Sequence, residues 1–293
     1  MSFLKQSPGN QKIHLINNMK MLIDDKDSLG LSSDNAFEPL ETQWVKNLIS
    51  TGDIVLDIGA NIGYYSLLFS SLVGEKGQVY AFEPESSNYK LLEKNLQLNN
   101  ITNVKTFQKG VSDKNATGIL YLCEDNKGMH RAYPSLLCGD GVDIDLVRLD
   151  SFFEQNAIQF NFIKMDIEGY EYLALKGMQK LIKNSQKLNL LMEFSPSSMV
   201  ECGHDPIKCI ELLENYSFTI YALGEELSLI NINELKEQLI LLKKTTRNLI
   251  AELNQNSQNY TNENITMMAI ERSQKSGYLR PIIENFVCIK DTN

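Results

Sequence analysis

A glycine-punctuated turn behind an apolar run is the first stretch whose residue types suggest chemistry. The sequence "DIGANIGYYS" (57–66) follows "DIVL", so a strand, a tight turn and a helix are expected in succession. In the dinucleotide fingerprint G-x-G-x-x-G, the second and third glycines keep side chains away from the ligand and the packed strand. Asn61 and Tyr64 occupy those two places here. The turn therefore disfavours a nicotinamide dinucleotide.

The charge of Asp57, two residues before Gly59, narrows the choice of ligand. A carboxylate close to a diphosphate is repelled, whereas S-adenosylmethionine has no phosphate and brings an ammonium and a sulfonium cation that favour a nearby carboxylate. Gly59 and Gly63 allow the turn, Asn61 tolerates an unusual backbone conformation, and free N–H groups of the following helix complete the pocket. We therefore expect these residues, with Ala60 between them, to bind S-adenosylmethionine.

Two later strand ends offer further contacts to a nucleoside. Glu83 ends "QVYAFE" twenty residues after the turn, where an acidic residue can accept both ribose hydroxyls. This supports a nucleoside without choosing among nucleosides; its alternative role is a charge at a helix start. The next strand runs into "KGVSD", whose backbone near Val111 and Ser112 is expected to lie along the adenine. Asp113 either reaches the adenine amine or caps the next turn.

A second group of acids follows a later strand. The stretch "FIKMDIEGYEYLALKGM" (162–178) contains Asp166, Glu168 and Glu171 where a strand leads into a helix. Ligands of open α/β sheets lie beyond the carboxyl ends of the strands, so Asp166 should point at the same site as Asp57. With Glu193 from the end of "LLMEF", these acids have the oxygen ligands that Mg²⁺ takes. Carboxylates at a helix start are often caps and dipole partners instead, so we assign no metal ligands and keep Mg²⁺ as an alternative.

Alternating elements must position these residues. From about residue 53, short apolar runs alternate with amphipathic stretches, which is typical of βαβ units in a mostly parallel sheet. Strands are predicted at 53–58, 78–83, 103–108, 160–167, 188–194 and 218–223, with further strands at 118–124, 142–149 and 285–290. Helices are predicted at 63–73 and 86–100.

The segment 226–284 differs from the rest and is poor in aromatic residues. Its first half places leucines in 4-3 spacing, which predicts a helix stripe: Leu235, Leu239, Leu242, Leu249 and Leu253, with Thr246 interrupting the series. The stripe packs on the main core, or it forms a lid or a dimer helix.

Composition limits the class of protein. The 293 residues are 43% apolar and 22% charged, which suits one large globular domain. A net charge of −9 argues against nucleic acid or an anionic membrane as partner. The five cysteines are scattered without a C-x-x-C pair, so free thiols are expected: Cys123, Cys138, Cys202, Cys209 and Cys288. The start lacks the pattern of a secretion signal, and no apolar run approaches the ~20 residues of a bilayer span. We expect a protein of the reducing cytoplasm.

The chain resembles the FkbM-type S-adenosylmethionine-dependent methyltransferases. The resemblance covers about residues 19–224 and the final strand, and it rests on "FEPLETQWV", "GDIVLDIGANIGYYS", "GQVYAFEPESSNYKLLEKNLQLNN", "VRLDSFF" and "FIKMDIEGYEYLALKGM". It implies a Rossmann-like class I fold, with helices on both faces of a seven-stranded, mostly parallel sheet of order 3-2-1-4-5-7-6. The segment "NFVCIK" would be the antiparallel seventh strand.

The resemblance also assigns residues and domains. It implies that the residues in the glycine turn and Glu83 bind the cofactor, and that Asp166 and Glu168 lie at the reaction centre. Residues 1–52 would be an N-terminal extension that packs on the core, and 53–293 the methyltransferase domain. Within that domain, 226–284 looks like a helical insertion before the last strand, longer than the family leads us to expect.

Methyl transfer is an in-line displacement, and a hydroxyl acceptor needs a general base to take its proton. We expect Asp166 or Glu168 to be that base, with Glu193 next in rank. His204 and His130 compete because imidazole titrates near neutral pH. We expect His204 only to precede an Asp-capped helix and His130 to be exposed in a long loop.

Several functions stay open at this point. The first is O-methylation of a hydroxyl on a sugar or secondary metabolite, and its close variant is N-methylation of an amide or peptide side chain. An NAD(P)-linked oxidoreductase and a non-catalytic nucleoside-binding scaffold are the alternatives from other classes. The partner would be a small-molecule, carbohydrate or peptide acceptor, with a homodimer through the late helix as a further expectation. The acceptor loops, expected at 125–141, 195–205 and 226–284, do not name a substrate.

Overall fold

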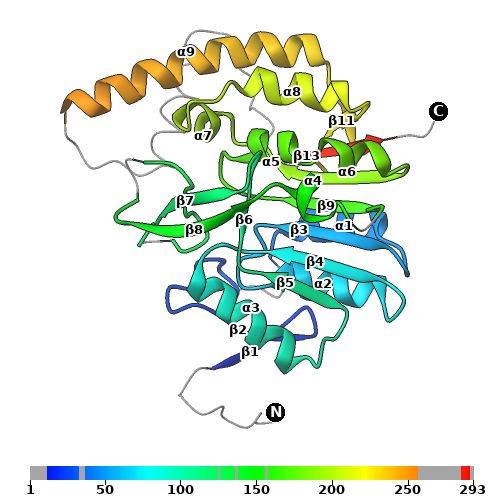
Figure 1. Cartoon of the computed structure of the whole chain (residues 1–293). Coiled ribbons are helices and arrows are strands. Elements are labelled where there is room, and N and C mark those ends of the chain that lie inside the picture. The colour runs from blue at the N-terminus through cyan, green and yellow to red at the C-terminus, as the bar shows by residue number, and fades with distance from the viewer. Residues whose placement is uncertain are drawn as a thin grey trace.

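An eight-stranded sheet forms the centre of the computed structural model (Figure 1). The structure describes residues 12–32, 37–124, 126–135, 138–155, 158–256 and 285–290. The sheet consists of β3 (Ile54–Ile58), β4 (Gln78–Phe82), β5 (Val104–Phe107), β9 (Phe162–Met165), β10 (Leu188–Glu193), β11 (Thr219–Ala222), β12 (Ser228–Leu229) and β13 (Asn285–Lys290).

The strand order is β12-β11-β13-β10-β9-β3-β4-β5. The run from β5 to β10 is parallel, and β13 pairs antiparallel with both β10 and β11. The predicted α/β fold with a mostly parallel sheet is confirmed. Numbered along the chain without β12, the order reads 3-2-1-4-5-7-6, and the two-residue β12 makes the count eight instead of seven because it pairs with the edge of β11.

Side chains alternate between the two faces of the sheet, and each face has its own core. Val55, Phe162 and Leu191 belong to one cluster, whereas Leu56 and Ile163 belong to the other. The first face is covered by α1 (Pro39–Leu48), α2 (Tyr64–Val73) and α3 (Ser86–Leu98). The second face is covered by α4 (Leu149–Phe152), α5 (Glu171–Gly177), α6 (Gln179–Asn184), α7 (Pro196–Glu201), α8 (Pro206–Asn215) and α9 (Ile232–Asn256).

The N-terminal hairpin of β1 (Ile13–Ile16) and β2 (Met19–Leu22) packs on α3. The buried amide of Asn95 in α3 accepts from the Leu22 N–H at 2.7 Å and donates to the Leu22 carbonyl at 2.9 Å. It also donates to the carbonyl of Ile62 in the glycine turn at 2.8 Å. One side chain thus joins the hairpin, the helix and the turn.

A separate three-stranded sheet lies beside the carboxyl ends of the central strands (Figure 1). It consists of β6 (Gly110–Val111), β8 (Gly141–Val147) and β7 (Ala116–Tyr121), in that order. The residues between β7 and β8, 122–140, are called the β7–β8 loop. A Cys123–Cys138 disulfide closes its base, with the two Cα atoms 4.2 Å apart. The expectation of free thiols is therefore wrong for this pair, because the antiparallel strands bring both ends of the loop together; Cys202, Cys209 and Cys288 are free.

Helix α9 lies across α7 and α8 (Figure 1). Leu235, Leu239, Leu242 and Leu249 are buried in the core of the second sheet face, so the stripe packs on the main core. The Leu253 side chain and residues 257–284 lie outside the described part of the chain. A homodimer through this segment stays a prediction. None of the helices in the described residues is both long and apolar enough to cross a bilayer.

The glycine turn touches the end of β9 at Gly59. Gly59 has φ +83°, and a Cβ added there would lie 1.9 Å from the Asp166 carbonyl oxygen. The two strand ends are also joined by a hydrogen bond from the Asp166 N–H to the Ile58 carbonyl at 3.0 Å. Any side chain at Gly59 would push apart the two loops that carry the predicted site.

This contact predicts a specific cost for Gly59→Ala. Gly52→Ala is the matched control, because Gly52 has φ +93° and an added Cβ would meet nothing within 4 Å. The control should lose about 1–2 kcal/mol of unfolding free energy from the left-handed backbone alone. Gly59→Ala should lose about 2 kcal/mol more, because the backbone must also move. Urea unfolding of both variants measures the difference, and equal losses would contradict the close contact.

Candidate active site

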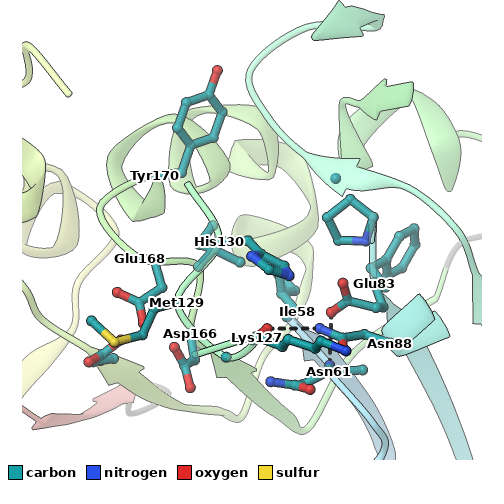
Figure 2. A pocket seen from close by; sticks show the side chains of 18 of the residues that line it. Ile58, Asn61, Glu83, Asn88, Lys127, Met129, His130, Asp166, Glu168 and Tyr170 are labelled. Carbon is teal, nitrogen blue, oxygen red and sulfur yellow. Dashed lines mark hydrogen bonds between the residues drawn. The ribbon is translucent and has the colours of Figure 1, made fainter. Parts of the chain in front are cut away.

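A cavity of about 260 Å³ opens at the carboxyl ends of β3, β4, β9 and β10, which is where open α/β sheets bind ligands. The β7–β8 loop and the three-stranded sheet form its other walls (Figure 2). Eight of the predicted site residues line it: Gly59, Ala60, Asn61, Glu83, Val111, Asp166, Glu168 and Glu193. Asp57, Gly63 and Ser112 do not line it.

Glu83 ties the glycine turn to the next strand end. Its carboxylate accepts the Asn61 N–H at 2.9 Å and the Glu85 N–H at 2.8 Å (Figure 2 shows the first of these). Asn61 has φ +49°, the left-handed conformation that its side chain tolerates. Burial raises the pKa of Glu83 to about 8, although both N–H groups oppose the shift. The glycine turn is therefore held against the cavity by a carboxyl group that faces the ligand position.

Asp57 lies behind the cavity wall because the pleat of β3 turns it toward α2. It is fully buried, and one carboxylate oxygen accepts from the Ser66 hydroxyl at 2.6 Å. The other oxygen, Oδ1, has no hydrogen-bond partner. Burial raises the pKa of Asp57 to about 6, against the opposing effect of Lys164 in the neighbouring strand. A carboxyl group that is shielded from water therefore lies behind the glycine turn and does not face the cavity.

Two other predicted residues, Gly63 and Ser112, lie within the elements that form the cavity wall and do not face the cavity. Gly63 precedes α2 with φ +92°, and a Cβ there would lie 2.6 Å from Leu92, so the glycine permits helix packing. Ser112 is buried, and its N–H bonds to the Val147 carbonyl at 2.9 Å. An apolar part of the cavity lies between the sheets and is lined by Gly110, Val111, Leu120, Ala132, Ile144 and Leu146.

Three carboxylates meet on the opposite side of the cavity, as the sequence predicted for Asp166 and Glu168. One oxygen from each of Asp166, Glu168 and Glu193 lies within 4.8 Å of the others. Glu168 has φ +57° and stands beside Gly169 at φ +99°, so neither residue is in regular structure. Glu193 Oε2 is buried without a hydrogen-bond partner.

Two cations that the sequence reading missed hold this cluster. Lys164 of β9 donates to Asp166 at 3.0 Å and lies 4.6 Å from the Tyr65 ring centre, while Arg131 of the β7–β8 loop pairs with Glu168. A lysine inside the buried run "FIKM" was a signal that could have found Lys164, because buried lysines need partners. No comparable sequence pattern indicates that Arg131, in a long loop, pairs with Glu168.

The two cations, together with burial, shift the pKa values of the three acids in different directions. Burial alone would raise the pKa of Asp166, but Lys164 holds it below its usual value. Burial and the adjacent charges of Asp166 and Glu168 raise the pKa of Glu193 well above its usual value. Burial also raises the pKa of Glu168, with Arg131 opposing the shift. The two shifts run in opposite directions, so the charged form is favoured at Asp166 and the neutral form at Glu193.

The donor set does not fit Mg²⁺. Two of the three carboxylates that meet, Asp166 and Glu168, are already paired with a cation, and the raised pKa of Glu193 favours its neutral form. Glu171 turns away from the cluster and accepts the N–H groups of Ile167 at 3.3 Å and Gly169 at 3.1 Å. It caps its own loop, as one of the two alternatives predicted. We propose no metal at this cluster.

The cavity also contains Glu38 and His130. The carboxylate of Glu38, from the "FEPLETQWV" stretch, accepts from the Tyr65 hydroxyl at 2.7 Å. His130 lines the cavity, and its Nδ1 accepts the Cys123 N–H at 3.0 Å. The expectation that His130 is plainly exposed is wrong, because the β7–β8 loop folds inward; burial lowers its pKa and favours the neutral ring. His204 precedes α8, which Asp205 caps as predicted.

Comparisons with known proteins agree with this geometry. A family model described as the methyltransferase FkbM domain matches residues 57–220. "Methyltransferase 1" of Beauveria bassiana (strain ARSEF 2860) is 24% identical over 144 residues, which cover 42% of this chain and 57% of that protein. "Methyltransferase sdnD" of Sordaria araneosa is 26% identical over 165 residues, which cover 45% of this chain and 62% of that protein. The chain thus matches less than two thirds of either relative's length.

Among solved structures, an O-methyltransferase from Bacillus cereus crystallised with SAH is 15% identical, with a TM-score of 0.42; the match covers 64% of this chain and 76% of that chain. A SAM-dependent O-methyltransferase from Thermotoga maritima is 11% identical, with a TM-score of 0.41 and coverage of 75% and 72%. At these TM-scores, the similarity adds nothing to what the topology shows. The family model spans more than half of the chain and both halves of the cavity, so this chain belongs to the FkbM methyltransferase family.

Proposed function

We propose that the chain is an S-adenosylmethionine-dependent methyltransferase that methylates a hydroxyl group on a sugar or secondary metabolite. The observation that carries the proposal is a cavity with a nucleoside-type wall on one side and a half-buried carboxylate cluster on the other. The family membership supports the same activity. The acceptor class rests on the chemistry of the cluster alone.

The residues of the first wall fit an adenosyl cofactor that carries positive charge. The backbone of Gly59, Ala60 and Asn61 and the carboxyl of Glu83 would hold the ribose, and the apolar part of the cavity would hold the adenine. The unpartnered oxygen of Asp57 favours a cation nearby and disfavours a diphosphate. When bound, S-adenosylmethionine supplies a methyl group already activated by sulfonium. The chain must then orient the acceptor and exclude water.

The residues of the second wall fit the removal of a proton from the acceptor. A general base works best when its pKa lies near the operating pH and it still ionises. The pKa of Asp166 is lowered, which makes it the weaker base, and the pKa of Glu193 is raised well above its usual value. Burial raises the pKa of Glu168, and the ion pair with Arg131 limits that shift by favouring the carboxylate form. We therefore assign the proton transfer to Glu168, with Asp166 accepting a hydrogen bond from the acceptor.

A carboxylate base suits a hydroxyl better than an amide. The amide nitrogen of a peptide side chain needs stronger deprotonation before it can attack, and the described cavity offers carboxylates and the neutral His130 for that task. O-methylation is accordingly the proposed reaction, and N-methylation is its variant. The aromatic side chains of Phe37, Tyr64 and Tyr65 line the cavity beside the acids and offer a surface for an acceptor ring.

The choice of cofactor is tested by calorimetric titration. S-adenosylmethionine and S-adenosylhomocysteine should each release or take up heat at one site per chain, and NAD⁺ and NADP⁺ should give no binding signal, because Asp57 and the side chain of Asn61 oppose a diphosphate. Binding of a nicotinamide dinucleotide without binding of S-adenosylhomocysteine would overturn the proposed function.

Asp57→Asn tests the buried charge. The pKa of Asp57 is raised from 3.8 to about 6 in the folded chain, so stability falls as the pH rises across that interval. The loss for a shift of this size is about 2–3 kcal/mol. Without ligand, the variant should exceed the wild type in Tm at pH 8, and its advantage should shrink toward pH 5. It should gain less Tm from S-adenosylmethionine, and an equal gain would contradict a role for the charge in cofactor binding.

Glu168→Gln and Asp166→Asn test the base. The transfer rate from S-adenosylmethionine should be measured with the acceptor that reacts fastest in a panel of methyl glycosides and phenols. Glu168→Gln should lower kcat by about 10²-fold or more, and Asp166→Asn by less, with cofactor affinity nearly unchanged. Glu214→Gln is the control, because Glu214 pairs with Lys236 on the surface. Full rates in both cavity variants would refute the assignment.

A further inference from the structure

The β7–β8 loop forms one wall of the cavity, and partners far apart in the sequence hold it there. Asn126, Lys127, Gly128, Met129 and His130 line the cavity from this loop (Figure 2 labels three of them). The Lys127 N–H donates to the Ser28 hydroxyl at 2.9 Å, and the Lys127 carbonyl accepts from Asn88 of α3 at 3.0 Å. The loop is therefore seated against the N-terminal segment and α3.

Arg131 stands directly behind this wall. Its backbone exchanges two hydrogen bonds with Tyr121 of β7, at 2.7 and 3.0 Å, which fixes the Cα position. Its side chain is 1% exposed and does not line the cavity. The guanidinium pairs with the Glu168 carboxylate and lies 3.4 Å from the Glu168 carbonyl oxygen. Arg131 thus contacts Glu168 from the side that a ligand does not reach.

Glu168 needs such a contact because its own backbone does not fix its direction. It stands between β9 and α5 in a left-handed conformation beside Gly169, and 15% of its side chain is exposed to the cavity. A planar guanidinium holds a carboxylate in one orientation better than an ammonium does. The same contact gives the buried charge of Arg131 the partner that burial requires.

We infer that Arg131 is a positioning residue for the transfer reaction: it fixes the Glu168 carboxylate and, through the same ion pair, keeps the β7–β8 loop seated as a wall of the cavity. The inference rests on the proposed function, because Glu168 is the base in that proposal. Arg131 acts through Glu168 and through the loop, and it touches neither the acceptor nor the cofactor. If Arg131 only stabilised the fold, its replacement would lower kcat and the affinity for the cofactor to a similar extent.

A double-mutant cycle separates these roles. Arg131→Met should lower kcat for the fastest methyl glycoside or phenol by about 30-fold or more, and should leave the affinity for S-adenosylhomocysteine within about threefold. In a Glu168→Gln background, Arg131→Met should alter kcat by less than about threefold, because the carboxylate through which Arg131 acts is already absent. Arg131→Lys should restore part of the rate. Arg148→Met is the matched control, since Arg148 pairs with Asp150 outside the cavity.

A second measurement does not depend on turnover. Hydrogen exchange of the Arg131 and Tyr121 amides should speed up in Arg131→Met and in Glu168→Gln to a similar extent, and should stay unchanged in Arg148→Met. Unchanged exchange in both cavity variants would overturn the seating role. Equal slowing by Arg131→Met in both backgrounds would overturn the positioning role. Wild-type rates in Glu168→Gln would instead refute the base assignment, and the positioning role would fall with it.

Discussion

The partial burial of three carboxylates beside two cations, Lys164 and Arg131, is the constraint on which the cavity depends. Charges taken out of water need partners with good geometry, and an acid left alone takes up a proton. Lys164 holds the pKa of Asp166 below its usual value, Arg131 pairs with Glu168, and the pKa of Glu193 is raised well above its usual value. The two acids that are paired with cations, Asp166 and Glu168, both follow β9, and the acid whose neutral form is favoured, Glu193, ends β10. The charge state of this side of the cavity therefore depends as much on the two cations as on the three acids.

The elements could be predicted because their signals are local. The apolar runs at 53–58, 78–83 and 188–194 became β3, β4 and β10 with ends shifted by no more than one residue. The meeting of Asp166 with Glu193 also followed from the sequence, since parallel strands bring their carboxyl ends to one edge. The position of Asp57 was not anticipated, because Asp57 was expected at the cofactor itself; the pleat sets it on the face shared with Val55 and α2, behind the cavity wall.

The features that could not be predicted lie in loops, because loops have no hydrophobic periodicity from which their path could be inferred. Arg131 and His130 lie in a long segment between two strands, and only its inward fold brings them to the cavity. The disulfide of Cys123 and Cys138 has the same origin, because the hairpin that aligns them is a tertiary feature. The relatives align over part of their length, so the loops around the cavity have to be understood from this chain's own contacts.

The way in which the β7–β8 loop is held has a consequence for protein engineering. Its anchors come from Ser28, Asn88 and Glu168, and Ser135 adds a hydrogen bond to Glu201 of α7 at 2.9 Å. If this loop alone were grafted into another protein, it would lose most of the contacts that hold it, because their partners lie outside the loop. Changing the acceptor of the proposed methyltransferase would therefore require exchanging all the residues that contact one another around this loop, because the loop sequence alone does not contain them.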